Sequence, residues 1–129
     1  MADTTKILII EDDVATRTLL KMILAPEGYD VLSAEDGDSG LKTALREMPR
    51  LIIVDIMMPN VSGWDVLAAL RRDPALQHIP ILICSVKDSK FDINMGFRLG
   101  ADAFLAKPFK PEVLRDKVKK LLERPAPDP

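Results

Sequence analysis

The stretch that decides the fold is Leu51-Ile52-Ile53-Val54-Asp55-Ile56-Met57-Met58-Pro59, which continues as Asn60-Val61-Ser62-Gly63. Its first four residues are apolar and mostly β-branched, which predicts a strand buried on both faces. The strand ends on Asp55, an acid that a hydrophobic core does not require. Because a loop with Pro59 and Gly63 follows, we expect Asp55 at the carboxyl edge of a sheet, where open α/β folds bind their ligands.

Strand and helix patterns alternate along the rest of the chain. Apolar runs predict strands at residues 7–10, 29–34, 51–54, 79–84 and 103–106. Each strand is followed by apolar residues at helical spacing, which are Ala15, Leu19, Met22 and Ile23; Leu41, Ala44, Leu45 and Met48; Gly63, Val66, Leu67 and Leu70; Phe91 to Leu99; and Leu114, Val118, Leu121 and Leu122. Strand–helix pairs with such short connections require right-handed crossovers. We therefore expect an α/β fold of the doubly wound (βα)5 kind, with a parallel sheet and helices on both faces.

The composition is that of one folded domain. The chain has 129 residues, 47% hydrophobic and 29% charged, with a net charge of −2. One domain over residues 1–123 accounts for this length, and residues 124–129 are expected to be a Pro-rich tail or the start of a linker. The charge balance gives no reason to expect nucleic acid as a partner. The polar start and short apolar runs argue against export and membrane insertion, and the single Cys84 suits a reducing cytoplasm.

Polar side chains follow four of the expected strands. They are Glu11, Asp12 and Asp13 after the first strand, Asp55 after the third, Ser85 after the fourth and Lys107 after the fifth. In a parallel sheet they share one edge, where several carboxylates repel one another unless a cation neutralises them. Mg²⁺ suits carboxylate, carbonyl and water oxygens. With Lys107 and Ser85 as donors, this edge can hold a phosphoryl group, and Asp55 can act as the nucleophile that forms an acyl phosphate.

Several polar residues also have purely structural interpretations. Asp13 directly precedes a helix and is more simply its N-cap. The bond between Lys107 and Pro108 can be cis, which would fix the direction in which the lysine points. His78 is interpreted as an exposed turn residue, and Cys84 as a buried and inert one.

Three runs of the sequence resemble the receiver domain of two-component response regulators. They are Lys6-Ile-Leu-Ile-Ile-Glu-Asp-Asp13, Val54-Asp-Ile-Met-Met-Pro59 with Gly63 beyond it, and Gly100-Ala-Asp-Ala-Phe-Leu-Ala-Lys-Pro-Phe109. The resemblance covers essentially the whole chain up to the tail. It implies a flavodoxin-like fold of strand order 2-1-3-4-5. It also implies a signalling domain rather than an enzyme, one that catalyses its own phosphorylation and slow autodephosphorylation.

The resemblance further implies the chemistry of the acidic edge. Asp55 would accept a phosphoryl group from a histidine kinase or a histidine phosphotransfer protein. Mg²⁺ would bind at the acidic pocket of Glu11 and Asp12, with Asp12, Asp55 and the main-chain oxygen of Met57 as its ligands. Measured back from Arg17, Glu11 and Asp12 form the pocket and Asp13 lies outside it.

The switch and the partners follow from the same resemblance. Ser85 and Lys107 would contact the phosphoryl oxygens, and Phe104 occupies the position of the family's switch aromatic. In this family the fourth helix, fifth strand and fifth helix often form the face that binds a downstream protein, an output domain or a second copy of the domain. The apolar residues of the fourth helix, 91–99, fit either a deeply packed helix or such an exposed face.

Two residues depart from the commoner pattern of the family. Val86 is β-branched where a small residue usually follows Ser85, so it can narrow the opening above Asp55. Met57 offers no polar side-chain atom to orient a hydrolytic water. Together they predict slow loss of the phosphoryl group.

Other functions fit the sequence less well. An aspartyl phosphohydrolase would want a second acid two residues after Asp55, where Met57 stands. A flavin or nucleotide site would want a Gly- or Ser/Thr-rich phosphate loop, where this chain has Glu11, Asp12 and Asp13. A receiver-like scaffold that binds partners without phosphorylation stays an open alternative.

Overall fold

The computed structural model describes residues 4–58 and 62–124. The strands are β1 (Lys6–Ile10), β2 (Asp30–Ala34), β3 (Leu51–Val54), β4 (Ile81–Ser85) and β5 (Ala103–Ala106). The helices are α1 (Val14–Leu24), the short 3₁₀-helix η1 (Ala25–Glu27), α2 (Gly37–Glu47), α3 (Gly63–Arg72), α4 (Lys90–Arg98) and α5 (Pro111–Leu122). The predicted alternation of strands and helices is therefore confirmed.

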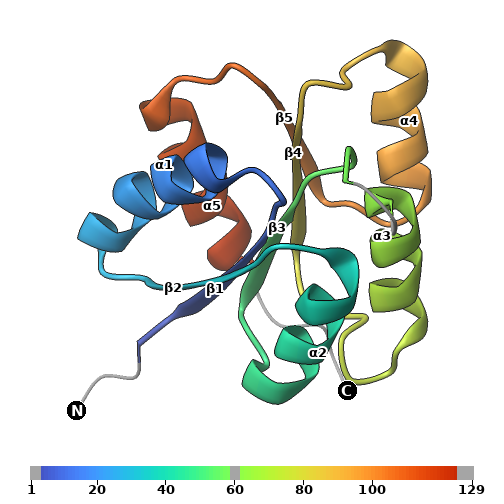
Figure 1. Cartoon of the computed structure of the whole chain (residues 1–129), viewed down its shortest axis with the longest axis horizontal. Helices are drawn as coiled ribbons and strands as arrows, with labels where there is room; N and C mark the ends of the chain where they lie inside the picture. Colours follow the sequence, from blue (N-terminus) through green and yellow to red (C-terminus); the bar gives the residue numbers. More distant parts are fainter. Residues whose placement is uncertain (1–3, 59–61, 125–129) are drawn as a thin grey trace.

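All neighbouring strands of the sheet are parallel, in the order β2-β1-β3-β4-β5. This order confirms the expected flavodoxin-like, doubly wound fold. Figure 1 shows α1 and α5 on one face of the sheet and α2, α3 and α4 on the other. Alternate strand residues supply the two cores: Leu8 and Ile52 pack toward α2 and α3, whereas Ile7 and Ile53 pack toward α1 and α5. Because both faces are covered, β3 is buried at all four of its positions, as its sequence predicts.

Three strands differ from the sequence prediction by one or two residues at their ends. Strand β1 begins at Lys6 rather than at residue 7, β2 begins at Asp30 rather than at residue 29, and β4 spans Ile81–Ser85 rather than 79–84. Pro80 has no N–H for the ladder, but its carbonyl accepts from the main-chain N of Ile52 at 3.0 Å. Regular pairing therefore starts one residue later, and β4 includes Ser85.

The buried stripe of α1 was predicted wrongly. Leu19 and Met22 are 47% and 68% exposed, and the buried residues are Leu20, Ile23 and Leu24. Leu20, Ile23 and Leu24 pack into the core between the sheet, α1 and α5. Arg17 lies on the same side of the helix, and its guanidinium donates to the main-chain oxygens of Glu11 and Asp12 at 2.7 and 3.0 Å, which is consistent with this orientation.

In α2 the predicted apolar face is only partly buried. Ala44 is fully buried, but Leu45 and Met48 are about half exposed. Gly40 is the reason, because a Cβ at this position would lie 2.6 Å from Ile10 of β1. The helix approaches the sheet through its small residues, so its larger ones lie at the flanks.

Helix α4 has the fewest buried residues of the five α-helices. Phe91 is 68% exposed and Phe97 is 48% exposed, and Gly96 is the buried residue of the helix. The sequence left open whether this helix is deeply packed or presents an exposed apolar face, and the structure shows the exposed apolar face.

The interpretations of His78 as an exposed turn residue and of Cys84 as a buried one are confirmed. Of the predicted tail, only Arg124 is described, and its guanidinium pairs with Asp102 at 3.0 Å. Residues 125–129 of that tail and residues 59–61 of the loop after β3 lie outside the described residues. Among the helices of residues 4–58 and 62–124, none has the length and apolar character needed to cross a membrane.

Candidate functional site at the carboxyl edge of the sheet

Asp55 follows the last residue of β3, and the neighbouring strands enclose it. Its main-chain N donates to the oxygen of Ile10 in β1 at 3.1 Å, and the side of β3 away from β1 is paired with β4. Only 6% of the residue is exposed. The loop beyond it returns close by, because Gly63 donates to the oxygen of Ile56 at 2.9 Å. A Cβ on Gly63 would come within 3.0 Å of the main chain at Asp55 and Ile56, so this close approach requires glycine.

Three carboxylates lie together at this edge. One oxygen each from Glu11, Asp12 and Asp55 lies within 4.8 Å of the other two. Opposite ligands of a Mg²⁺ ion at about 2.1 Å stand roughly 4.2 Å apart, so small side-chain adjustments would let one ion contact all three. The residues present therefore fit a hard divalent cation, and the cluster could hold a metal. The accessible member is Asp12, which is exposed, whereas Glu11 is 2% exposed.

Lys107 lies between two of these carboxylates. Its Nζ donates to Oδ2 of Asp55 at 2.9 Å and forms a short hydrogen bond to Oε1 of Glu11. Burial alone would lower the pKa of Lys107, but its hydrogen bonds and the charges of Glu11 and Asp55 outweigh burial, so the pKa is raised. Because its pKa is raised, the Lys107 ammonium stays charged beside Asp55. The bond between Lys107 and Pro108 is cis.

Glu11 has an unusual protonation equilibrium. Burial is the largest effect and raises its pKa; the hydrogen bond from Lys107 opposes this, and the charge of Asp55 raises the pKa further, to about 7. Its Oε2 also accepts from the main-chain N of Asp13 at 3.3 Å. A cation at this site would favour the charged carboxylate, so proton and metal compete for Glu11.

Each oxygen of the Asp55 carboxylate has a different donor. Oδ1 accepts from the main-chain N of Met57 at 3.0 Å, and Oδ2 accepts from Lys107. The carboxylate is therefore held in one orientation. A fixed, poorly solvated oxygen favours nucleophilic attack on an electrophile such as phosphorus.

Ser85 lies at the end of β4 and is completely buried. Its Oγ accepts from the main-chain N of Lys87 at 3.2 Å, so its hydroxyl proton is free to donate elsewhere. Its main-chain oxygen accepts from the N of Lys107 at 3.0 Å, which ties the ends of β4 and β5 together.

The structure thus brings Glu11, Asp12, Asp55 and Lys107 into one cluster. Asp13 is the N-cap of α1, as interpreted from the sequence, and accepts from the main-chain N of Thr16 at 2.9 Å. Ser85 lies at the adjacent strand end, and its side chain makes no hydrogen bond or ion pair with these four side chains among the described residues. Phe104 is half-buried against the core on the α3 and α4 side.

Sequence reasoning missed a cavity beside Asp55. It has a volume of about 400 Å³ and is lined by Ile56, Met57, Met58, Ser62, Trp64 and Lys87. Met57, which lines the cavity, is 48% exposed, and Val86, which does not line it, is 56% exposed. Trp64 falls within the helix that the sequence predicts from Gly63 to Leu70, and no local sequence pattern points to this cavity.

The comparisons with known proteins agree with this geometry. The family model described as the response regulator receiver domain matches residues 7–119. The chain belongs to this family. The receiver domain is 41% identical over 119 residues to the alkaline phosphatase synthesis transcriptional regulatory protein PhoP of Bacillus subtilis, covering 92% of this chain and 49% of that protein. It is also 41% identical to the DNA-binding dual master transcriptional regulator RpaA of a Synechocystis strain, with the same coverage.

Solved structures of other proteins have the same fold as this receiver domain. The chemotaxis protein CheY4 of Vibrio cholerae has a TM-score of 0.88 at 29% identity, covering 92% of this chain and 99% of that chain. A response regulator of Chloroflexus aurantiacus, titled as putative, has a TM-score of 0.90 at 30% identity, covering 95% of this chain and all of that one. The receiver domain spans about half the length of the curated relatives it matches. It is a signalling domain of two-component systems.

Proposed function

We propose that Asp55 accepts a phosphoryl group from a histidine kinase or a histidine phosphotransfer protein, in a reaction that requires Mg²⁺. The observation that carries this proposal is the fixed carboxylate of Asp55, held by Lys107 and the N–H of Met57 beside two further acids. A buried carboxylate with both oxygens oriented and a cation at one of them fits a nucleophile better than a structural acid.

In the proposed reaction one oxygen of Asp55 forms a bond to phosphorus while the bond between phosphorus and the donor histidine nitrogen breaks. The histidine nitrogen keeps the electron pair and takes up a proton. Glu11, Asp12, Asp55 and the main-chain oxygen of Met57 would hold Mg²⁺, which supplies positive charge to the phosphoryl oxygens. Lys107 would follow the growing charge from the carboxylate to a phosphoryl oxygen.

Ser85 and Phe104 would then convert the chemistry into a change of surface. The hydroxyl proton of Ser85 is not used by its contact with Lys87, so it can donate to a phosphoryl oxygen. Phe104 is half-buried beside α4 and lies on the neighbouring strand. We propose that movement of Ser85 toward the phosphoryl group lets the ring of Phe104 turn inward, which changes the face formed by α4, β5 and α5.

That face is the proposed site for a partner. Phe91 and Phe97 of α4 and Val113 of α5 are large apolar side chains exposed there. The partner is a downstream protein, an output domain or a second copy of the chain. The relatives named as transcriptional regulators are about twice as long, so an output domain in the same polypeptide is part of this proposal.

The test is the mass of the intact protein after incubation with a small phosphodonor and Mg²⁺. We expect a gain of one phosphoryl group, lost in Asp55→Asn and lost when a chelator removes Mg²⁺. Asp65→Asn, at an exposed acid of α3, is the matched control and should keep the gain. No gain in the unsubstituted chain would favour the alternative, a scaffold that binds partners without phosphorylation. A gain that persists in Asp55→Asn would place the acceptor elsewhere.

A further inference from the structure

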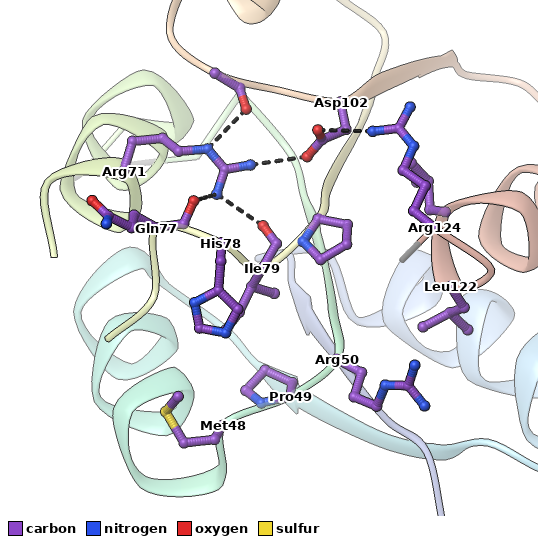
Figure 2. A pocket seen from close by; sticks show the side chains of 13 residues that line it. Met48, Pro49, Arg50, Arg71, Gln77, His78, Ile79, Asp102, Leu122 and Arg124 are labelled. Atoms are coloured by element: carbon purple, nitrogen blue, oxygen red, sulfur yellow. Dashed lines mark hydrogen bonds and ion pairs between the residues drawn. The ribbon is translucent and has the colours of Figure 1, made fainter. Parts of the chain in front are cut away.

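A second cavity lies at the opposite, amino edge of the sheet, away from Asp55. Its volume is about 580 Å³, within the usual range for sites that bind small molecules. Figure 2 shows the side chains around it, among them Arg50, Arg71, His78 and Arg124. These residues come from the chain just before β3, from the end of α3, from the turn before β4 and from the end of α5.

Arg71 and Asp102 form an ion pair in the wall of this cavity. Arg71 donates to the main-chain oxygens of Gly100, Gln77 and Ile79 at 2.8 to 2.9 Å. Its remaining nitrogen pairs with Asp102 at 2.9 Å, and Figure 2 shows this set of bonds. Four of its five N–H donors bond to protein atoms, so Arg71 contributes mainly shape and charge to the cavity.

The charge of the cavity is not balanced. The lining contains three arginines and a single acid, Asp102, which Arg71 and Arg124 share. The guanidinium of Arg50 makes no hydrogen bond or ion pair among the described residues, and the residue is exposed. A surplus of two positive charges, one of them on an uncommitted guanidinium, favours a ligand with a group of two negative charges.

The rest of the lining is apolar and rigid. Pro49, Pro80 and Ile79 lie between the charged side chains, and Leu122 lies beside Arg50 and Arg124 in Figure 2. Proline rings lose no rotamer freedom when a ligand covers them. They suit a flat apolar body, which inorganic phosphate lacks.

We propose that this cavity binds a small organic phosphomonoester, with its phosphate at Arg50 and its apolar body against Pro49 and Pro80. A phosphomonoester carries nearly two negative charges at neutral pH, which matches the surplus in the lining. The site lies at the other end of the strands from Asp55, so occupancy needs neither Mg²⁺ nor the acceptor carboxylate. The inference therefore stands apart from the proposed phosphorylation.

The chain carries its own reporter for this cavity. His78 is the only histidine in the sequence and lines the cavity, so its ring protons give resolved signals in a one-dimensional proton spectrum. The only tryptophan, Trp64, lines the other cavity, beside Asp55, and its fluorescence reports on that site separately.

The experiment titrates adenosine monophosphate into the full chain at constant pH with a chelator present. We expect a saturable shift of the His78 ring signals, and a much smaller response to adenosine or to inorganic phosphate at equal concentration. Arg50→Ala should weaken binding about tenfold, the loss expected for one charged hydrogen bond. Arg72→Ala removes an exposed arginine that does not line the cavity and should leave binding unchanged.

The outcomes that overturn this proposal are distinct. The absence of a saturable shift of the His78 signals would overturn it. Equal binding of adenosine, which lacks the phosphate, would also overturn it. Equal binding of inorganic phosphate would show that charge alone acts and that no organic body is recognised. Asp55→Asn should bind adenosine monophosphate as the parent chain does; loss of binding in that variant would assign the ligand to the phosphorylation site instead.

Discussion

The buried Glu11 should make the metal-free receiver domain less stable as the pH rises. Its pKa in the folded state is about 7 because burial disfavours its charge, whereas 4.5 is the ordinary value that the unfolded chain should have. Between these two values the folded state binds more protons than the unfolded state. The free energy of unfolding must therefore fall with increasing pH across this interval and level off above it.

The size of the effect follows from the two pKa values. Each unit of difference corresponds to about 1.4 kcal/mol once both states have ionised. Between about pH 5 and about pH 8, the two titrations together predict a loss of roughly 2.5 kcal/mol from this one group. Such a change is a large fraction of the stability of a small domain.

The assay is urea unfolding at these two pH values with a chelator present. Glu11→Gln removes the titrating group and should remove the loss of stability between them. Glu35→Gln, at an exposed carboxylate, is the matched control and should keep it. Three carboxylates have lowered pKa values, so they make the folded state more stable as the pH rises: Asp13, Asp36 and Glu47. This gain occurs mainly near and below their ordinary pKa values, which lie below the pH window of the assay.

Added Mg²⁺ should reduce the loss, because a cation at the acidic cluster stabilises the charged form of Glu11. The reasoning would be refuted if the parent chain and Glu11→Gln showed the same difference between the two pH values. A loss that Mg²⁺ leaves unchanged would argue that the ion does not reach Glu11.

Two further predictions concern the loop after β3. Gly63→Ala places a Cβ against the main chain of Asp55 and Ile56, which cannot yield as a side chain can, so we expect destabilisation at or above the usual range of about 1 to 3 kcal/mol for overpacking. Gly40→Ala, whose Cβ would meet only side-chain atoms of Ile10, should cost less in the same urea unfolding assay; an equal cost would contradict this. Because Met57 offers no polar atom to a hydrolytic water, the phosphorylated chain should lose its phosphoryl group slowly in Mg²⁺ buffer, and Met57→Asn should lose it faster. A half-life of seconds for the unsubstituted chain, followed by intact mass, would rule out this prediction.

The carboxyl edge of the sheet could be predicted from the sequence because topology leaves little freedom there. Once the strands are parallel, the residues that follow them must share an edge, so Glu11, Asp55 and Lys107 were expected together. Which acid is buried was not predictable. Glu11 and Asp12 are adjacent and chemically alike, and only the packed structure makes one of them 2% exposed and the other exposed.

The rotation of α1 and the cavity at the amino edge depend on long-range contacts that leave no local pattern. Helix α1 has apolar residues on two sides, and the side that is buried is the one whose residues pack into the core and whose Arg17 bonds to main-chain oxygens before the helix. The wall of the cavity joins Arg71 and Asp102, which are 31 residues apart, and neither position departs from the composition of an ordinary helix end or loop.

The two donors at Asp55 have a stereochemical consequence. One oxygen receives a hydrogen bond from the main chain at Met57, and the other receives one from the ammonium at the end of the long side chain of Lys107. The oxygens of a free carboxylate are interchangeable, but these two are already distinct before any partner arrives. A lysine can withdraw from its oxygen, whereas a peptide N–H in a folded loop cannot, so the new bond should form at Oδ2. In the proposed reaction, folding would then select the reacting atom as well as the reacting residue.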